Sequence, residues 1–202
     1  MKLTRAYRRL ITFWWFTVDR LLVFCLLLLI VRGVILSLAA SPSVASRLGL
    51  DTFHFFKRHA LVVGPAVLVM FSVSLLSPRL IRRVSLILFG VCLALMVVTL
   101  LVGNEIKGAV RWLQFGGFSL QASEFAKPAF IVVCAWLFSQ AQVRDDVPSL
   151  PLAIMFYAVF VGLLVLQPDF GQAFLITLVW GGLFFLAGMP FILVGALGIA
   201  LM

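Results

Sequence analysis

Gln121, Glu124 and Lys127 follow one another at intervals of three residues, next to a strongly apolar stretch. On a helix this spacing keeps all three side chains within a face of about 120°. A lysine can neutralise a bound anion, and a carboxylate can position that lysine or carry a proton. Pro128 follows directly and lacks an N–H, so we expect a kink or a local opening of the helix at this polar turn. Together these features predict a cavity that binds an anion.

The same turn must lie at membrane depth. Residues 128–138 form an apolar run of only 11 residues, whereas a helix needs about 20 to span hydrocarbon. The helix must therefore begin near Leu120, and it carries Glu124 and Lys127 into the membrane. A charged residue there costs about 2.5–3.5 kcal/mol, which favours a functional role. The alternative is a structural ion pair between these two residues, with no ligand.

Further polar residues are expected at the same depth. Arg111 and Trp112 lie in the loop before this helix, and Asp169 lies in the tight turn 167–171 between two later apolar segments. If the segments alternate across the membrane, the loop and the turn face the same side. Two simpler interpretations stay open. Asp169 could cap the helix that follows it, and Trp112 could belong to an interfacial aromatic belt.

The elements that position these residues are apolar helices. Apolar residues make up 64% of the chain and charged residues 11%, with a mean hydropathy of +1.20, whereas about a quarter of a soluble domain is charged. We predict an all-α, polytopic helical membrane protein. About seven transmembrane segments are expected, at residues 18–38, 60–76, 84–102, 120–139, 151–166, 170–187 and 191–202.

Charge sets the expected domains and orientation. The net charge of +9 comes from basic residues at the ends of apolar segments, so it does not indicate nucleic-acid binding. With the N-terminus in the cytoplasm, nine Lys and Arg fall inside and six outside. We predict a basic cytoplasmic N-terminus at residues 1–17 and one transmembrane domain at 18–202, truncated at its C-terminus. A signal peptide is the alternative for the first segment, whose 20 or so apolar residues favour a retained helix. Arg111 and Asp169 then lie outside.

No metal site is indicated. Cys25, Cys92 and Cys134 lie inside apolar segments and fit packing roles. His54 and His59 lack the clustered ligands that a metal requires. A divalent cation bound in another way is not readable from the sequence.

Two long motifs resemble the SEDS family (shape, elongation, division and sporulation). The first spans residues 107–127 and contains Lys107-Gly-Ala-Val-Arg-Trp-Leu and Gly116-Gly-Phe-Ser-Leu-Gln-Ala-Ser-Glu-Phe-Ala-Lys127. The second is Leu166-Gln-Pro-Asp-Phe-Gly171, with Leu186-Ala-Gly188 after it, and Phe55-Phe-Lys-Arg58 also fits. The resemblance covers essentially the whole chain. It is strongest to the cell-division branch in its alphaproteobacterial form, with the elongation branch second.

The resemblance implies a peptidoglycan glycosyltransferase of about ten transmembrane helices in the bacterial inner membrane, at the division site. Such enzymes polymerise lipid II, a disaccharide-pentapeptide on undecaprenyl diphosphate, at the outer face of the membrane during septal cell-wall synthesis. Their partners are a class B penicillin-binding protein and other membrane proteins of the division machinery. Matched to the motifs, Arg111, Trp112 and Gln121 become substrate-binding residues. Glu124, Lys127 and Asp169 become supporting catalytic residues.

The chain also departs from the family pattern. Ala122 stands where the family usually has Pro, and Val110 where it commonly has Arg. The family's main catalytic Asp belongs to a later outer loop, beyond Met202, so these 202 residues alone are expected to be inactive. A lipid II flippase or transporter and a non-catalytic division scaffold are the alternative functions.

Overall fold

The computed structural model describes residues 12, 14–106, 109–115, 118–143 and 148–188. The chain divides into two compact units, Met1–Ser77 and Pro78–Met202, and each is described by itself. The sequence predicted one transmembrane domain from residue 18 onward, and that single domain stays a prediction.

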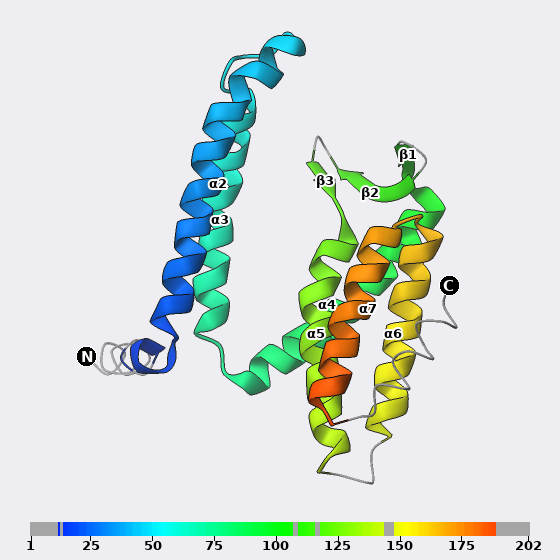
Figure 1. Cartoon of the computed structure of the whole chain (residues 1–202). Coiled ribbons are helices and arrows are strands. Elements are labelled where there is room, and N and C mark those ends of the chain that lie inside the picture. Colours follow the sequence, from blue (N-terminus) through cyan, green and yellow to red (C-terminus); the bar gives the residue numbers. More distant parts are fainter. Residues whose placement is uncertain (1–11, 13, 107–108, 116–117, 144–147, 189–202) are drawn as a thin grey trace, which may run out of the picture. The chain divides into compact units, whose positions relative to one another are not determined.

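The first unit is built on a hairpin of two helices, α2 (Arg20–Arg47) and α3 (His54–Ser74), which run side by side (Figure 1). Asp19 starts α2, because its Oδ1 accepts hydrogen bonds from the backbone N–H groups of Leu21 and Leu22 at 2.9 and 3.1 Å. At the same end of the hairpin, Trp14 Nε1 donates a hydrogen bond to Ser74 Oγ at 2.9 Å.

An exposed ion pair joins the turn between α2 and α3 to the first turn of α3. Lys57 Nζ lies 2.6 Å from Asp51 Oδ2, and this hydrogen bond, with the lysine charge, lowers the pKa of the Asp51 carboxyl. Both side chains are well exposed, so water and salt screen the pair. Gly49 makes the turn with φ +67°, a conformation that favours glycine.

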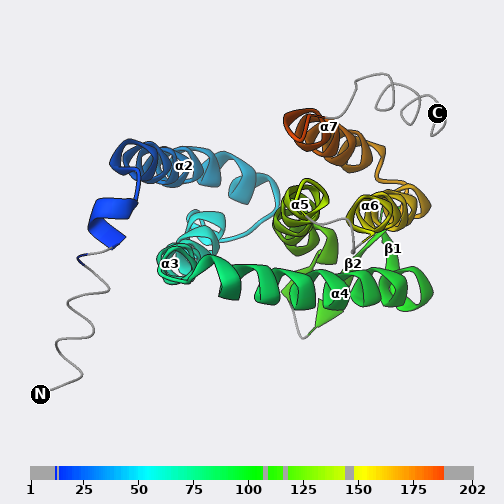
Figure 2. The same cartoon turned by 90° about the horizontal axis from the view of Figure 1, so that it is seen from below.

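The second unit is a bundle of four helices, α4 (Pro78–Val102), α5 (Ala122–Ala141), α6 (Ser149–Leu166) and α7 (Phe170–Leu186). The helix α5 packs against the other three. Viewed from below, α5 and α6 are seen end-on and α4 runs along one side of them (Figure 2). Because successive helices reverse direction, α5 and α7 both begin at the end where α4 and α6 finish (Figure 1).

Three short antiparallel strands cover that end of the bundle: β1 (Asn104–Ile106), β2 (Ala109–Phe115) and β3 (Phe118–Leu120). The register pairs Asn104 with Trp112 on one side of β2, and Leu113 with Leu120 on the other. The central strand β2 contacts both α4 and α5. The sheet therefore ties the polar loop to the helix ends.

Aromatic rings fill the bundle core. Phe89 of α4 has its ring centroid 5.6 Å from that of Phe130 on α5 and 5.7 Å from that of Phe160 on α6. Tyr157 and Trp180 stack at 4.5 Å between α6 and α7. Lipid tails are as apolar as these side chains, so close packing rather than water exclusion holds such helices together in a membrane.

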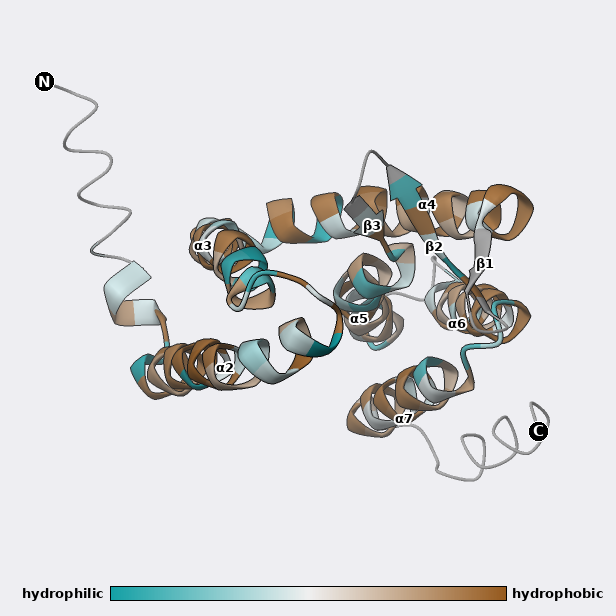
Figure 3. Ribbon diagram, turned by 90° about the horizontal axis from the view of Figure 1, so that it is seen from above, coloured by the Kyte–Doolittle hydropathy of each residue, from teal (hydrophilic) through white to brown (hydrophobic). Residues whose placement is uncertain are grey.

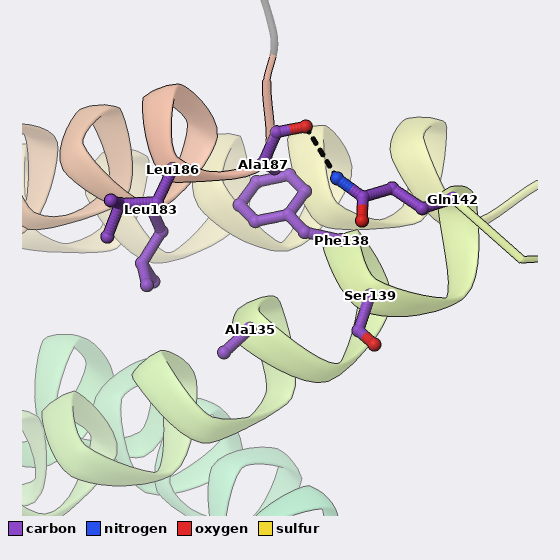
Figure 4. Close-up of a pocket in the computed structure, with 7 residues that line it drawn as sticks. All are labelled: Ala135, Phe138, Ser139, Gln142, Leu183, Leu186 and Ala187. Carbon is purple, nitrogen blue, oxygen red and sulfur yellow. Dashed lines mark hydrogen bonds between the residues drawn. The ribbon is translucent and has the colours of Figure 1, made fainter.

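At the end opposite the sheet, a polar contact joins α5 to α7. Gln142 Nε2 donates a hydrogen bond to the carbonyl of Ala187 at 2.7 Å, which satisfies an acceptor at the C-terminus of α7 (Figure 4). A cavity of about 200 Å³ lies beside this contact, with Phe138 and Leu183 among its lining residues. We assign this contact a structural role.

The predicted fold class is confirmed: the described chain is a polytopic, helical membrane protein. Five of its helices are long and apolar enough to span a bilayer, and α7 is a shorter apolar helix. The hydropathy colouring shows mainly apolar helices beside a more polar β2 (Figure 3). The three strands were not predicted. The expected segment 191–202 lies outside the described residues.

Gly103 gives the first testable prediction. A Cβ at this position would lie 2.3 Å from the carbonyl oxygen of Thr99 and 2.7 Å from Cγ1 of Val110. The carbonyl belongs to the backbone of α4 and cannot turn away, so Gly103→Ala must shift β2 relative to α4. We expect a lowered melting temperature of the full-length protein in detergent. Gly90→Ala, in open space on the same helix, is the control. Equal melting temperatures for the two variants would contradict the close approach.

Candidate functional site

Arg111 connects β2 to the turn between α6 and α7. Its guanidinium donates hydrogen bonds to two backbone carbonyls of the turn, from Nε to Gln167 at 3.4 Å and from Nη2 to Pro168. Its Nη1 also lies 3.4 Å from Asp169 Oδ1. A guanidinium presents its donors in a rigid fork, so one side chain can hold three acceptors of the same turn. Arg111 thus fixes the turn to the sheet.

Asp169 is a buried carboxylate with two partners. The residue is 5% exposed. Besides Arg111, its Oδ2 accepts a hydrogen bond from Gln121 Nε2 at 3.4 Å. Asp169 occupies the position before α7, but its side chain makes no capping hydrogen bond there. The interpretation of Asp169 as a helix cap is therefore wrong, because its carboxylate faces Arg111 and Gln121 instead.

Lys127 stands at the centre of a second set of contacts, six residues after Gln121. Its Nζ lies 2.7 Å from Glu124 Oε2 and donates a hydrogen bond to Gln172 Oε1 at 2.8 Å. The Lys127 side chain is 16% exposed and that of Glu124 is 48% exposed. The ion pair named in the structural alternative therefore exists, with Lys127 mostly buried and Glu124 half-exposed.

The two sets lie at the same end because α5 and α7 begin together. Gln121 and Lys127 come from the start of α5, while Asp169 and Gln172 come from the start of α7. Two hydrogen bonds, Gln121 to Asp169 and Lys127 to Gln172, join these two helix starts. The sequence predicted that separate segments bring these charges to one depth, and the contacts agree with that arrangement. We call the set of Arg111, Gln121, Glu124, Lys127, Asp169 and Gln172 the polar cluster.

Trp112 does not join the polar cluster. Side chains alternate across a strand, so Trp112 leaves β2 on the face opposite Arg111. Its side chain is half-buried, and among the described residues it forms no ring contact or side-chain hydrogen bond with the cluster. Its predicted role in substrate binding stays a prediction.

Sequence reasoning missed two glutamines. Gln167 is 2% exposed, and its Nε2 donates a hydrogen bond to the Met96 carbonyl at 3.1 Å, which fixes the turn to α4. Gln172 holds Lys127. Both are polar residues at the boundary of long apolar segments, and that position was the signal that could have singled them out.

The helix α5 continues through Pro128 without a break in its assigned span. The opening expected at the polar turn does not interrupt the helix, and the expected kink stays a prediction. The side chains of Glu124 and Lys127 leave an uninterrupted helix in its first two turns.

The polar cluster is formally neutral. Two cations, Arg111 and Lys127, face two carboxylates, Asp169 and Glu124. Neutral pairing makes charges tolerable at membrane depth. Of the four charged side chains, Glu124 is the most exposed, so its contact is the easiest to exchange for a ligand. Among the described residues, no three His, Cys, Asp or Glu side chains gather as metal ligands would.

The fold and the polar cluster define a polytopic membrane protein with charged side chains gathered at one end of a helix bundle. A family model described as "Cell cycle protein" and covering FtsW, RodA and SpoVE matches residues 19–202. The chain belongs to this family, and the predicted SEDS resemblance is confirmed.

Named proteins similar to this chain belong to the same family. A Caulobacter vibrioides protein named "Probable peptidoglycan glycosyltransferase FtsW" is 42% identical over 195 residues, which cover 96% of this chain and 50% of that protein. A Halorhodospira halophila protein of the same name is 34% identical, over 87% of this chain and 46% of that protein. The chain thus spans about half the length of these relatives.

Solved structures are similar as well. The rod shape determining protein RodA of Thermus thermophilus matches with a TM-score of 0.61 and 30% identity, over 84% of this chain and 58% of that one. A chain of a peptidoglycan synthase complex that couples polymerization and crosslinking matches with a TM-score of 0.59 and 29% identity, over 84% of this chain and 52% of that one. The family's helical membrane fold extends to this chain.

Proposed function

We propose that this chain is part of a peptidoglycan glycosyltransferase that polymerises lipid II during septal cell-wall synthesis in cell division. The names of the relatives support this function. The observation that carries it is the polar cluster, in which Arg111 and Lys127 reach one end of the bundle from separate elements. Two cations at one depth suit a diphosphate.

The polar cluster acts on the leaving group. In the reaction a hydroxyl oxygen of the acceptor sugar forms a bond to the anomeric carbon of the donor. The bond from that carbon to the diphosphate oxygen breaks, and the hydroxyl proton passes to a base. Negative charge grows on the departing diphosphate, so placed cations lower the barrier. Lys127 and the guanidinium of Arg111 supply them.

The remaining residues of the polar cluster position these cations. Gln121 holds Asp169, and Asp169 faces the Arg111 guanidinium. Glu124 keeps Lys127 paired until the diphosphate takes its place, and Gln172 holds the ammonium throughout. Neither carboxylate is assigned as the base that activates the sugar hydroxyl. The family resemblance implies that this base is an Asp beyond Met202.

The orientation is part of the proposal: the sheet end of the bundle faces the periplasm, and the N-terminus lies in the cytoplasm of a bacterial inner membrane. Cysteine labelling tests it. Gln114, exposed on β2, and Val143, exposed beyond α5 at the other end, are each replaced by cysteine in a protein without native cysteines. In spheroplasts, an impermeant maleimide should label Gln114→Cys at once and Val143→Cys only after lysis. The reverse pattern would overturn the outer-face chemistry.

The partners proposed are a class B penicillin-binding protein and other membrane proteins of the division machinery. The structural similarity to a chain of a peptidoglycan synthase complex supports the first. A divalent cation, which is not readable from the sequence, is a further part of the proposal. It would reach the site with the substrate diphosphate, and a fall in polymerisation on addition of EDTA, restored by Mg²⁺, would support it.

The direct test of the function uses the purified full-length protein, its penicillin-binding partner and fluorescent lipid II. Glycan polymer resolved on a gel is the expected result. Gln142→Ala, at the far end of the bundle, is the control and should keep polymerising. Movement of lipid II between leaflets of a vesicle, without polymer from the wild-type protein, would instead support the flippase alternative.

A further inference from the structure

A second charged site lies at the end of the four-helix bundle opposite the sheet. A cavity of about 410 Å³ opens there between the start of α4 and the end of α5. Its size falls within the range of about 300–1,000 Å³ that is usual for small-molecule sites. It is lined by Arg79, Arg82, Arg83, Leu86, Trp136 and Gln140.

The three arginines converge because of their spacing. Arg79 lies three residues before Arg82 and four before Arg83, so all three share one face of α4. Arg79 and Arg83 are exposed, while Arg82 is half-buried. No ion pair among the described residues involves any of the three. Within the described chain, this cavity therefore has a net positive charge.

Trp136 and Gln140 complete the cavity from α5. The guanidinium carbon of Arg82 lies 6.0 Å from the centroid of the Trp136 ring, within reach of a cation–π contact. Arg82 Nε donates a hydrogen bond to the Pro78 carbonyl at 3.3 Å. These two contacts hold the guanidinium in place, so its orientation is set before a ligand arrives.

We propose that this cavity binds the phosphate of an anionic phospholipid. Guanidinium groups bind phosphate oxygens through paired hydrogen bonds, and a tryptophan is suited to the headgroup depth of a membrane. Leu86, one turn deeper on α4, continues the lining toward the acyl chains. Membrane orientation requires only that positive charges lie on one side. It does not require three arginines on one face, with one of them held over an indole ring.

Two other sources of negative charge are distinguished by experiment. Asp145 and Asp146 precede α6 in sequence and lie outside the described residues, so competition by their carboxylates is tested by substitution. Soluble phosphate shares the chemistry of the headgroup without its acyl chains. Both are outcomes of the test that would overturn the proposal.

The test uses the full-length protein in nanodiscs that contain phosphatidylcholine with or without phosphatidylglycerol. Lipid retained after extraction is measured by native mass spectrometry. We expect phosphatidylglycerol to be retained in preference, and Arg82→Gln to weaken this retention by about tenfold, the effect of one charged hydrogen bond. Trp136→Leu should weaken it too. Arg58→Gln removes an equal charge from an exposed position in the first unit and should leave retention unchanged.

Three results would overturn the proposal that this cavity binds an anionic phospholipid. The first is equal loss of phosphatidylglycerol from Arg58→Gln and Arg82→Gln, which would indicate general surface charge. The second is full displacement of the lipid by inorganic phosphate. The third is retention that appears only after Asp145→Asn and Asp146→Asn. The polar cluster is untouched in every variant, so this test can fail while the proposed glycosyltransferase function stands.

Discussion

Arg111→Ala in the full-length protein is expected to slow lipid II polymerisation by about a hundredfold, the effect typical of losing one donor from a site that stabilises developing negative charge. The variant removes a cation from the proposed diphosphate site. It also frees the α6–α7 turn, whose Gln167 and Pro168 carbonyls and Asp169 carboxylate all face the guanidinium. The measurement is the initial rate of polymer formation with the partner protein present.

Stability should fall less than activity in this variant. Removing one partner of a fully buried ion pair costs about 3–5 kcal/mol. The Arg111 side chain is 34% exposed, so solvent screening lowers that cost substantially. Arg111→Lys keeps the positive charge but loses the forked donors of the guanidinium. Its polymerisation rate should lie between those of Arg111→Ala and the wild-type protein. A variant that polymerises at the wild-type rate, or one lost wholly to misfolding, would contradict the assigned role.

The second large effect is expected for Glu124→Gln. This variant should slow polymerisation by about a hundredfold, the effect typical of misplacing a positioned group, while leaving membrane expression near normal. Lys127 would keep its hydrogen bond to Gln172, and Glu124 is half-exposed, so the fold loses little. Polymerisation falls because the Glu124 carboxylate no longer orients the Lys127 ammonium before the diphosphate binds.

The control for Glu124→Gln is Asp51→Asn, which breaks the exposed ion pair with Lys57 in the first unit. Exposed pairs contribute only about 0–1 kcal/mol, so expression and polymerisation should stay near wild-type levels. If Glu124→Gln instead aggregates or fails to reach the membrane, the pair is structural and the simpler interpretation of the sequence holds.

The helices could be predicted from sequence because length and hydropathy nearly determine a membrane span. The helix through Glu124 and Lys127 was expected to begin near Leu120, and α5 begins at Ala122. The apolar run 128–138 was too short to span a bilayer alone. The minimum length of a membrane-spanning helix therefore placed the charged turn inside the helix. The alternation of successive segments across the membrane predicted that Arg111 and Asp169 lie on the same side.

The contacts among these residues could not be predicted in the same way. A carboxylate before a helix usually caps it, but Asp169 faces Arg111 and Gln121 because β2 reaches over the turn. The strands themselves were missed, since seven residues or fewer in a polar loop carry little periodicity. Gln167 was missed because its partner, the Met96 carbonyl, is 71 residues away.

Binding of the lipid II diphosphate by the polar cluster can be measured directly as an affinity. The dissociation constant of lipid II is measured for the full-length protein and for Lys127→Met, a variant of similar volume without the ammonium. If Lys127 binds the diphosphate, binding is weaker by about tenfold or more in the variant, equivalent to about 1.4 kcal/mol or more. Added salt should also weaken binding to the wild-type protein more than binding to the variant. Equal affinity of both proteins, with the same dependence on salt, would contradict diphosphate binding by the polar cluster.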